Sequence, residues 1–464
     1  MRVRSNHRAS ILVQLLIFAV LCLMSSRATP AQPSGWLDPY RDNTSRLISE
    51  SLATQFAWDR LAYMGDTFGH RLSGSRGLED TIEWAVAEMK KDGLENVRAE
   101  PVKVPYWVRG RESVTLLGPR PVDLPMLGLG NSVGTPPGGI EGDVLVVRSF
   151  AELESAGPRV KSKIVLFNAP FTNYEDTVVY RTSGASRAAA LGAAGALVRA
   201  VGPPGLRTPH TGMLRYSETD PKIPAASISV EDAERLQRLQ DRGAKVRVRL
   251  KMEARFLPDA DSANVVAEIR GRERPEEVVV VAGHLDSWDV GTGSTDDGAG
   301  CIVTWEALRL MKKLNLQPRR TVRVVLFTNE ENGLAGGRAY LERHRSKLAH
   351  HVLMLESDSG VLKPSSFGFT GSATARATIQ QIASLLTAIG LDGVNSTGGG
   401  ADIGPSVEAA GIPAMSLEGA GNYFLIHHTE ADTVDKIDPK DMARASAAIA
   451  VLAYVVADMP ERLR

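Results

Sequence analysis

The run Val278-Val-Val-Val-Ala-Gly-His284-Leu-Asp286 decides the fold class of this 464-residue chain. Its first five residues are continuously apolar, which is typical of a strand buried on both faces of a parallel sheet. Two polar side chains, His284 and Asp286, follow at once. Ligands bind at the carboxyl ends of the strands in open α/β sheets. The run therefore predicts a central strand whose end carries a functional site.

The same placement recurs twice further along the chain. Val322 to Phe327 predicts a second strand with Glu330-Glu331 just past its end, and Val352 to Leu355 predicts a third, followed by Asp358. Helical spacing between the first two strands is shown by Ile302, Trp305, Leu308 and Met311. From about Asn264 onward, the alternation predicts an α/β domain with a mixed, largely parallel central sheet flanked by helices.

Two further groups add to these polar residues, Asp296-Asp297-Gly298 and His427-His428-Thr-Glu-Ala-Asp432-Thr. Each motif alone has a structural explanation, since Asp-Asp-Gly is a common turn and Glu-Glu suits a helix N-terminus. Together they offer imidazoles and carboxylates, which zinc prefers when coordination is left open for water and substrate. The set predicts a two-metal hydrolase. We interpret five further histidines as structural or, for His210, solvated: His70, His210, His344 and His350-His351.

Composition and the N-terminus point to an exported protein. Lys+Arg equals Asp+Glu, so no global field favours nucleic acid or an anionic membrane. Three early arginines, the apolar run Ile11 to Met24 and small residues up to Ala31 predict a signal peptide over residues 1–31, with an uncleaved anchor as the alternative. We expect a periplasmic or extracellular protein without membrane attachment after signal removal. Its remaining cysteine, Cys301, then has no disulfide partner within the chain.

The rest of the chain divides into three blocks. Residues 32–112 are helical in pattern, with a stripe from Ile82 to Met89 that Gly93 ends. In residues 113–255, short β-rich runs alternate with loops and one Ala-rich helix: Val144 to Val147, Lys163 to Phe167 and the helix Ala185 to Leu197. We expect residues 32–112 and 256–464 to form one catalytic domain and residues 113–255 a β-rich domain inserted into it.

At this point the motifs resemble a known family. His284, Asp296, Glu330-Glu331, Asp358 and His428, with Asp-Gly-Ala-Gly after Asp296, are similar to the M28 zinc metallopeptidases. Gly-His-Leu-Asp-Ser-Trp-Asp (283–289) and Glu-Ser-Asp-Ser-Gly (356–360) are most similar to its carboxypeptidase Q-like branch. The middle block, including Ile223-Pro-Ala-Ala-Ser-Ile, resembles the protease-associated domain which that branch inserts. The resemblance implies a zinc aminopeptidase (phosphorylase/hydrolase-like) fold.

The resemblance also implies a role for each site residue. Two zinc ions per chain would be bridged by Asp296, with His284 and Asp358 completing one site and Glu331 and His428 the other. Glu330 would be the general base, and Asp286 would orient His284 through its free ring nitrogen. His427, where several relatives carry Tyr, would donate to the oxyanion. The Asp296–Asp297 peptide bond is expected to be cis, as in family members.

These roles predict a di-zinc exopeptidase for short peptides, chiefly dipeptides with free termini. The run Gly398 to Asp402 offers backbone donors for a substrate carboxylate, with Gly399, Gly400 and Asp402 as binding residues, although a flexible turn explains it equally well. Amino- or carboxy-terminal polarity and a possible homodimer stay open. The alternatives are a catalytically silent receptor or scaffold ectodomain and a one-zinc glutaminyl cyclase-like transferase.

Overall fold

The computed structural model describes residues 35–118 and 120–463. The predicted signal peptide lies outside the described residues. The chain divides into two compact units, and the boundary in the sequence lies between Arg41 and Asp42. In the first, the short turn Asp38–Tyr40 is described. The second unit carries both sheets and every site residue named above.

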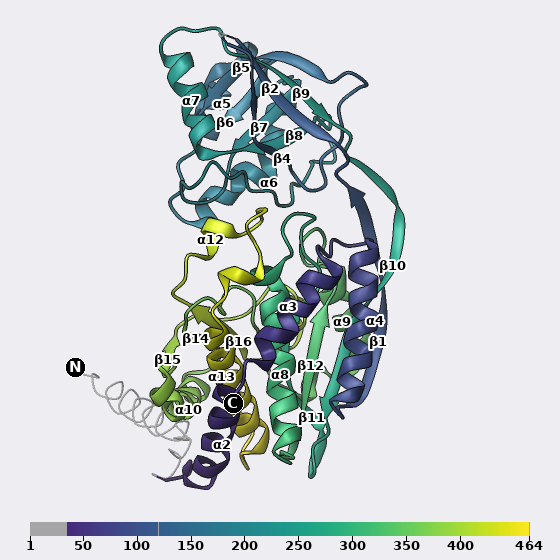
Figure 1. Ribbon diagram of the computed structural model, residues 1–464, viewed down its shortest axis with the longest axis vertical. Coiled ribbons are helices and arrows are strands. Elements are labelled where there is room, and N and C mark those ends of the chain that lie inside the picture. Colours follow the sequence, from purple (N-terminus) through teal and green to yellow (C-terminus); the bar gives the residue numbers. More distant parts are fainter. Residues whose placement is uncertain (1–34, 119, 464) are drawn as a thin grey trace, which may run out of the picture. The chain divides into compact units, whose positions relative to one another are not determined.

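Within the described residues, eight strands form the first sheet in the order β1-β10-β12-β11-β13-β16-β14-β15 (Figure 1). In that order, their bounds are Glu95–Val108, Arg255–Ile269, Arg320–Phe327, Arg274–His284, His351–Glu356, Ala414–Gly419, Pro364–Thr370 and Gly393–Asn395. The central strands β12, β11, β13 and β16 run parallel, whereas β1, β10 and β14 pair antiparallel with their inner neighbours. The predicted mixed, largely parallel sheet is confirmed.

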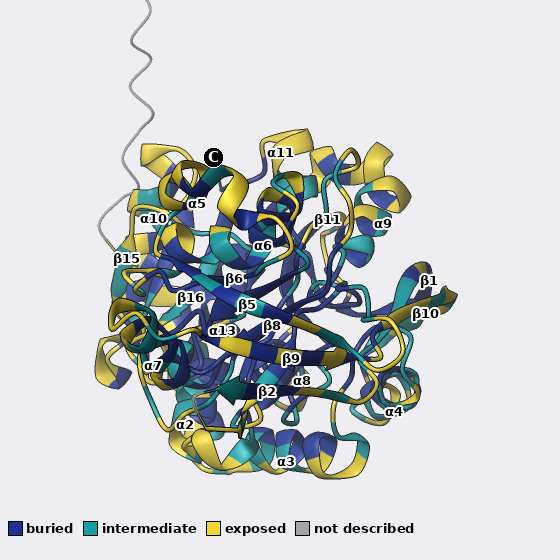
Figure 2. Cartoon of the chain, turned by 90° about the horizontal axis from the view of Figure 1, so that it is seen from above, coloured by how far each residue is buried: buried dark blue, intermediate teal, exposed yellow. Residues whose placement is uncertain are grey.

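Helices pack on both faces of this sheet. Their bounds are α2 Arg41–Leu52, α3 Phe56–Phe68, α4 Arg76–Lys91, α8 Ala299–Lys313, α9 Ala335–His344, α10 Ala373–Ala383, α11 Gly404–Ala410, α12 Tyr423–Ile426 and α13 Pro439–Asp458. Successive side chains of a strand face opposite ways. Val278 and Val280 share one face of β11 and lie in the same core as Tyr340 of α9 and Ile403. Helices α8 and α13 also contact β11. Figure 2 shows an exposed end of β10 and one exposed side of α3.

The helix predicted around Ile82 is α4, and its ends have clear local causes. Ser75 Oγ accepts a hydrogen bond from the backbone N–H of Leu78 at 3.3 Å, which caps the first turn. Gly93, with φ of 75°, follows the last turn in a conformation that favours glycine. The buried stripe of α4 includes Ile82 and Met89.

The second sheet has the strand order β3-β2-β9-β5-β6-β7-β8-β4. In that order, its bounds are Val122–Leu124, Glu112–Gly118, Arg247–Met252, Ile140–Val147, Ile164–Phe167, Gly195–Arg199, Ala225–Ile228 and Met126–Gly128. Its helices are α5 Phe150–Ala156, α6 Tyr174–Ala190 and α7 Val230–Asp241. All these elements fall between Glu112 and Met252. We call residues 112–252 the inserted block.

The predicted Ala-rich helix exists, but its bounds were wrong. Helix α6 already begins at Tyr174, where Asn173 Oδ1 caps it by accepting from the N–H of Asp176 at 2.8 Å, and it ends at Ala190. Leu197 lies in β7, a strand buried on both faces between β6 and β8. A short buried strand carries no alternation, so Gly195-Ala-Leu-Val continued the apolar pattern of the helix before it.

Two further observations bear on membrane attachment and on disulfide bonding. Within the described part, none of the helices has the length and apolar character that crossing a membrane requires. Cys301, at the start of α8, is fully buried and its thiol is free.

Candidate metal centre and active site

The site forms where three parallel strands end. Strand β11 lies between β12 and β13: the chain passes from β11 to β12 and then crosses β11 to reach β13 on its other side. His284 is the last residue of β11, Glu330 and Glu331 follow β12, and Asp358 follows β13. This arrangement creates a crevice at the carboxyl edge of an α/β sheet. The predicted placement of these four residues is confirmed.

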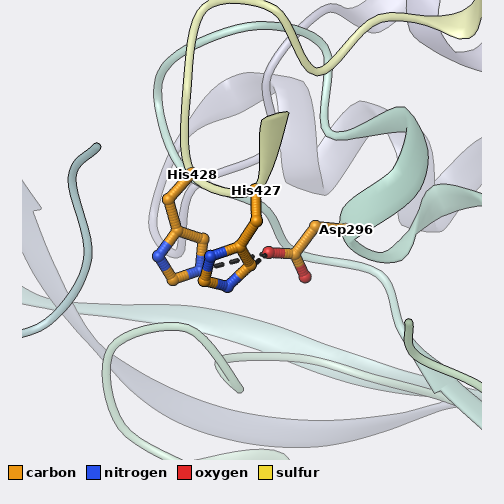
Figure 3. A group of neighbouring side chains, drawn as sticks. All are labelled: Asp296, His427 and His428. Atoms are coloured by element: carbon orange, nitrogen blue, oxygen red, sulfur yellow. Dashed lines mark ion pairs between the residues drawn. The ribbon is translucent and has the colours of Figure 1, made fainter. Parts of the chain in front are cut away.

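Asp296 lies at the centre of the group. Its Oδ1 is 3.3 Å from His284 Nε2, and its Oδ2 is 3.1 Å from His428 Nε2 and 3.5 Å from His427 Nε2. Figure 3 shows the imidazoles of His427 and His428 pointing at one carboxylate oxygen of Asp296. Ligand atoms of Asp296, His427 and His428 lie within 4.8 Å of one another, and so do those of His284, Asp296 and Asp358. Asp296 thus belongs to two potential metal-binding groups.

Glu331 lies beside the group of Asp296, His427 and His428. Its Oε2 is 3.0 Å from His428 Nε2, and its Oε1 is buried with no hydrogen-bond partner in the described part of the chain. Burial, and then the charge of Asp296, raise the pKa of Glu331 to about 7, and the same two causes raise the pKa of Asp358 to about 6. Buried carboxylates with imidazoles between them are a donor set that fits zinc.

The contact of Asp286 differs from the predicted one. His284 Nδ1 is 3.0 Å from the backbone carbonyl oxygen of Asp286, whereas the Asp286 carboxylate is 3.9 Å away. That carboxylate instead accepts from the backbone N–H of Glu330 at 2.9 Å and of Glu331 at 3.3 Å. Ser73 Oγ reaches it at 3.5 Å. Asp286 therefore holds the main chain of the Glu330-Glu331 pair.

The residue that holds the loop between His284 and Asp296 was not predicted from the sequence. Arg71 is fully buried, and its guanidinium donates to the carbonyls of Leu285 at 2.6 Å, Thr292 at 2.7 Å and Gly293 at 2.8 Å. These carbonyls belong to the loop between His284 and Asp296. The motif Arg71-Leu-Ser-Gly-Ser75 gave no signal beyond a turn, because its partners are over 200 residues away.

Two acids without a predicted contact fix the backbone around Asp296. Asp432 accepts from the N–H of Thr295 at 2.6 Å and of Asp296 at 3.2 Å. Asp297 accepts from the N–H of His284 at 2.9 Å and of Gly300 at 3.0 Å. The peptide bond between Asp296 and Asp297 is cis, as the family resemblance implied.

The Gly-rich run contacts a carboxylate of the protein itself. The N–H groups of Asp402 and Ile403 donate to Glu356 Oε2 at 3.1 and 2.9 Å. Gly400 lies so close to the Glu356 carboxyl group that a Cβ at this position would overlap it. Asp402 is buried, and within the described residues neither of its side-chain oxygens has a hydrogen-bond partner. Asp402 and Ile403 are therefore not free to bind a substrate carboxylate through their backbone, and no contact of Gly399 supports such a role.

The inserted block contributes residues that were not predicted for the site. Arg181 of α6 places Nη1 3.3 Å from His428 Nδ1, and its Nη2 donates to Tyr174 Oη at 2.7 Å. His210 was predicted to be solvated, but it is buried at 3% exposure. Its ring packs against Gly202 of the same block, and its pKa falls to about 3 because of burial and then nearby His428. The prediction failed because distant segments enclose His210.

The other histidines keep structural contacts. His344 Nε2 lies 3.2 Å from Glu100 Oε2, and His351 Nε2 lies 2.9 Å from Tyr340 Oη. His351 opens β13, at the end of the strand opposite to Asp358. His70 and His350 are exposed. None of these four contacts a residue of the proposed metal groups in the described part of the chain.

Comparison with known proteins agrees with this geometry. The model of peptidase family M28 matches residues 264–453. Carboxypeptidase Q of Bos taurus is 48% identical over 408 residues, which cover 88% of this chain and 86% of that protein. Carboxypeptidase Q of Homo sapiens is 47% identical with the same coverage.

Solved structures show the same likeness. A crystal structure of a peptidase M28 precursor from Shewanella amazonensis SB2B has a TM-score of 0.88 and 33% identity, covering 92% of this chain and 98% of that one. A zinc aminopeptidase from Bacillus subtilis shares the fold at a TM-score of 0.67 and 19% identity, covering 87% of this chain and 94% of that one. The chain therefore belongs to peptidase family M28, in its carboxypeptidase Q branch, and is a zinc metallo-exopeptidase.

Proposed function

We propose that the chain is a di-zinc exopeptidase that hydrolyses short peptides and prefers dipeptides. The observation that carries this proposal is the position of the Asp296 carboxylate. One of its oxygens faces His284 and the other faces His428, at 3.3 and 3.1 Å. A carboxylate flanked in this way suits a bridge between two metal ions.

Charge supports two ions rather than one. His284 and Asp358 would complete one site and Glu331 and His428 the other, so three carboxylates including Asp296 lie among the ligands. With Glu330 they carry four negative charges, which balance two Zn²⁺. When bound, the zinc ions would supply Lewis-acid activation of the scissile carbonyl and favour the ionisation of water at neutral pH.

Glu330 is the proposed general base. It is half-buried beside the ligand Glu331, and its backbone is held by Asp286 at 2.9 Å, so its carboxylate has a defined position. Burial raises the pKa of Glu330 well above its usual range, which suits a group that accepts a proton. Glu330 would take a proton from the attacking water and pass it to the leaving amine.

His427 is the proposed donor to the oxyanion. Its ring stacks on His428 with centroids 3.5 Å apart, and its Nδ1 is buried without a hydrogen-bond partner in the described residues. Burial, and then the neighbouring His428, hold the pKa of His427 well below its usual range. The ring is therefore neutral at pH 7 and can donate one N–H to developing negative charge.

A buried cation supports a substrate with a free carboxylate. Arg181 is 5% exposed, and its Nε has no hydrogen-bond partner in the described part of the chain. Among the described residues its hydrogen-bonding contacts are Tyr174 Oη, the Thr211 carbonyl and His428 Nδ1, all of them neutral or cationic groups. Leaving a buried charge uncompensated is costly. We propose that the carboxylate of a short peptide compensates Arg181, in place of the Gly-rich run predicted from sequence.

Location and assembly complete the proposal. The basic and apolar composition of residues 1–31 supports export to the periplasm or the extracellular space. The domain division at residues 113–255 and a homodimer stay predictions. The first is supported by a second sheet that lies between Glu112 and Met252.

Metal analysis and a substrate panel test the function. We expect about two zinc ions per chain, and near one in His428→Ala, because one site would lose an imidazole. The panel compares a dipeptide, its N-acetyl form, its amide and a hexapeptide, and the free dipeptide should be fastest. A wild type with one zinc that cyclises N-terminal glutamine would instead support the cyclase alternative.

Arg181→Met tests the carboxylate contact. The variant should raise KM for the dipeptide but leave KM for the dipeptide amide unchanged. Arg187→Met is a matched control, since Arg187 lies on the same helix but is half-exposed and 3.8 Å from Glu154. An equal effect of Arg181→Met on both substrates would contradict the proposed role.

A further inference from the structure

The segment Tyr423–His428, which carries the last proposed ligand, packs against the inserted block (Figure 1). The ring of Tyr174, the first residue of α6, stacks on Phe424 with centroids 5.0 Å apart and an interplanar angle of 17°. It also meets His427 edge-on, at 5.2 Å and 89°. Phe171, just before α6, lies 6.0 Å from Phe424. Aromatic residues of the block thus form one wall against α12.

The backbone of His428 is held from the same side. His428 has φ of 60°, in the left-handed region that a residue with a side chain adopts only at a cost. Its carbonyl accepts a hydrogen bond from the N–H of Thr211, a residue of the inserted block, at 2.9 Å. The block therefore contributes to holding a conformation that the local sequence does not favour.

Gly212 leaves the room that this contact needs. A Cβ at Gly212 would lie 2.7 Å from His428 Nδ1 and would overlap the Arg181 guanidinium. Its φ of 125° also disfavours any other residue. The backbone of the block thus approaches the imidazole as closely as a glycine permits, which limits the positions open to the ring.

Around the first sheet, side chains contact this segment, including Asp296 and Glu331 at the two imidazoles. Tyr423 Oη donates to Asp358 Oδ1 at 3.3 Å, and the Trp288 ring lies edge-on to His428 at 5.7 Å. Neither contact fixes the His428 backbone. Helix α12 itself has only four residues, too few to be stable without tertiary packing.

We propose that Tyr174 is a positioning residue for the zinc site formed by Glu331 and His428. Together with Thr211 and Gly212 it fixes His427 and His428, so the site keeps its zinc ion only while the inserted block is docked on α12. This inference rests on the proposed di-zinc function and deepens it, because it assigns the inserted block a part in metal retention.

The test compares zinc retention in three variants of the full-length enzyme. Tyr174→Leu removes the aromatic wall, Tyr174→Phe keeps the ring and removes only the hydroxyl, and Tyr180→Leu is the matched control. Tyr180 lies on the same helix but contacts Phe150 and Phe167 inside the block. Zinc per chain is measured after dialysis against a chelator, and zinc release is followed with a chromogenic chelator.

We expect Tyr174→Leu to weaken retention of one zinc ion by about 10–100-fold, the usual effect of losing a residue that supports a ligand. Tyr174→Phe and Tyr180→Leu should release zinc like the wild type. Gly212→Ala, which displaces His428 directly, should lose the same single ion. It decides the question if Tyr174→Leu does not fold.

Other outcomes would overturn either the positioning role or the di-zinc proposal. Unchanged release in Tyr174→Leu and Gly212→Ala overturns the positioning role, as does equally fast release in Tyr180→Leu, which would reflect a loosened block. A wild type with a single zinc overturns the di-zinc proposal instead. The positioning role then depends on whether Tyr174→Leu speeds the release of that one ion.

Discussion

Asp286→Asn offers the sharpest test of how the Glu330-Glu331 pair is held. In the wild type, the Asp286 carboxylate accepts from the N–H groups of Glu330 and Glu331 at 2.9 and 3.3 Å. An asparagine keeps one acceptor oxygen but turns an NH₂ group toward the other N–H. One hydrogen bond to a charged group is lost, which costs about 1.5–3 kcal/mol.

The cost should fall on turnover, because the bond positions Glu330. If the whole free-energy cost of the lost hydrogen bond raises the activation barrier, kcat drops by about 10–150-fold, since each 1.36 kcal/mol corresponds to a factor of ten. Zinc content should stay near the wild-type value, because Asp286 contributes only its carbonyl oxygen to the close contact with His284. The assay is steady-state hydrolysis of a dipeptide together with metal analysis of the same sample.

Ser73→Ala is the matched control. Its hydroxyl touches the same Asp286 carboxylate, but at 3.5 Å, so kcat should change by no more than about threefold. A wild-type kcat in Asp286→Asn would refute the positioning argument. Loss of zinc with a proportional loss of activity would show that Asp286 acts through His284, as the sequence-based prediction held.

Three further predictions follow from named contacts. Glu330→Gln should lower kcat by about 10²–10⁴-fold with zinc retained, whereas Glu331→Gln should lose zinc; the reverse pattern would mean that the roles are swapped. Arg71→Met breaks three short bonds to loop carbonyls and should lower the free energy of unfolding by about 3–6 kcal/mol in denaturant titration; an unchanged midpoint would contradict this. For Glu100, burial opposes ionisation, but the hydrogen bond and charge of His344 outweigh it and lower the pKa to about 2. Its contribution to stability is therefore complete above the ordinary pKa of 4.5 and is lost as pH falls toward 2. The difference in unfolding free energy between wild type and Glu100→Gln should shrink from pH 6 to pH 3, and a constant difference would refute the shift.

The strands and the strand-end positions of the proposed ligands were predictable because their signal is local. A strand buried on both faces must be apolar throughout, so Val278 to Ala282 could be recognised without its neighbours. The side chain that follows such a strand lies at the sheet edge whatever the loops do. The same locality explains the misplaced helix, because a run of small and apolar residues before Leu197 fits both a helix and a buried strand.

The supporting contacts were not predictable because their partners lie far apart in sequence. Arg181 and His428 are 247 residues apart, and Arg71 is 214 residues from Leu285. Periodicity carries no information about such pairs. The family resemblance implied that Asp286 contacts His284, but a sequence cannot show whether a side-chain or a backbone oxygen makes the contact.

The spacing His428-Thr-Glu-Ala-Asp432 has a reason that only the structure reveals. His428 Nε2 approaches the Asp296 carboxylate at 3.1 Å, and Asp432, one turn later, accepts from the backbone N–H of Asp296 at 3.2 Å. The same short segment therefore fixes both the side chain and the main chain of the proposed bridging residue. Thr429 closes the turn, since its hydroxyl donates to the Ile426 carbonyl at 2.7 Å and its own carbonyl accepts from the N–H of Asp432 at 3.2 Å. A shift of this segment would thus move His428 and Asp296, the proposed ligand and the proposed bridge, together, which is why its attachment to the inserted block matters for the whole proposed centre.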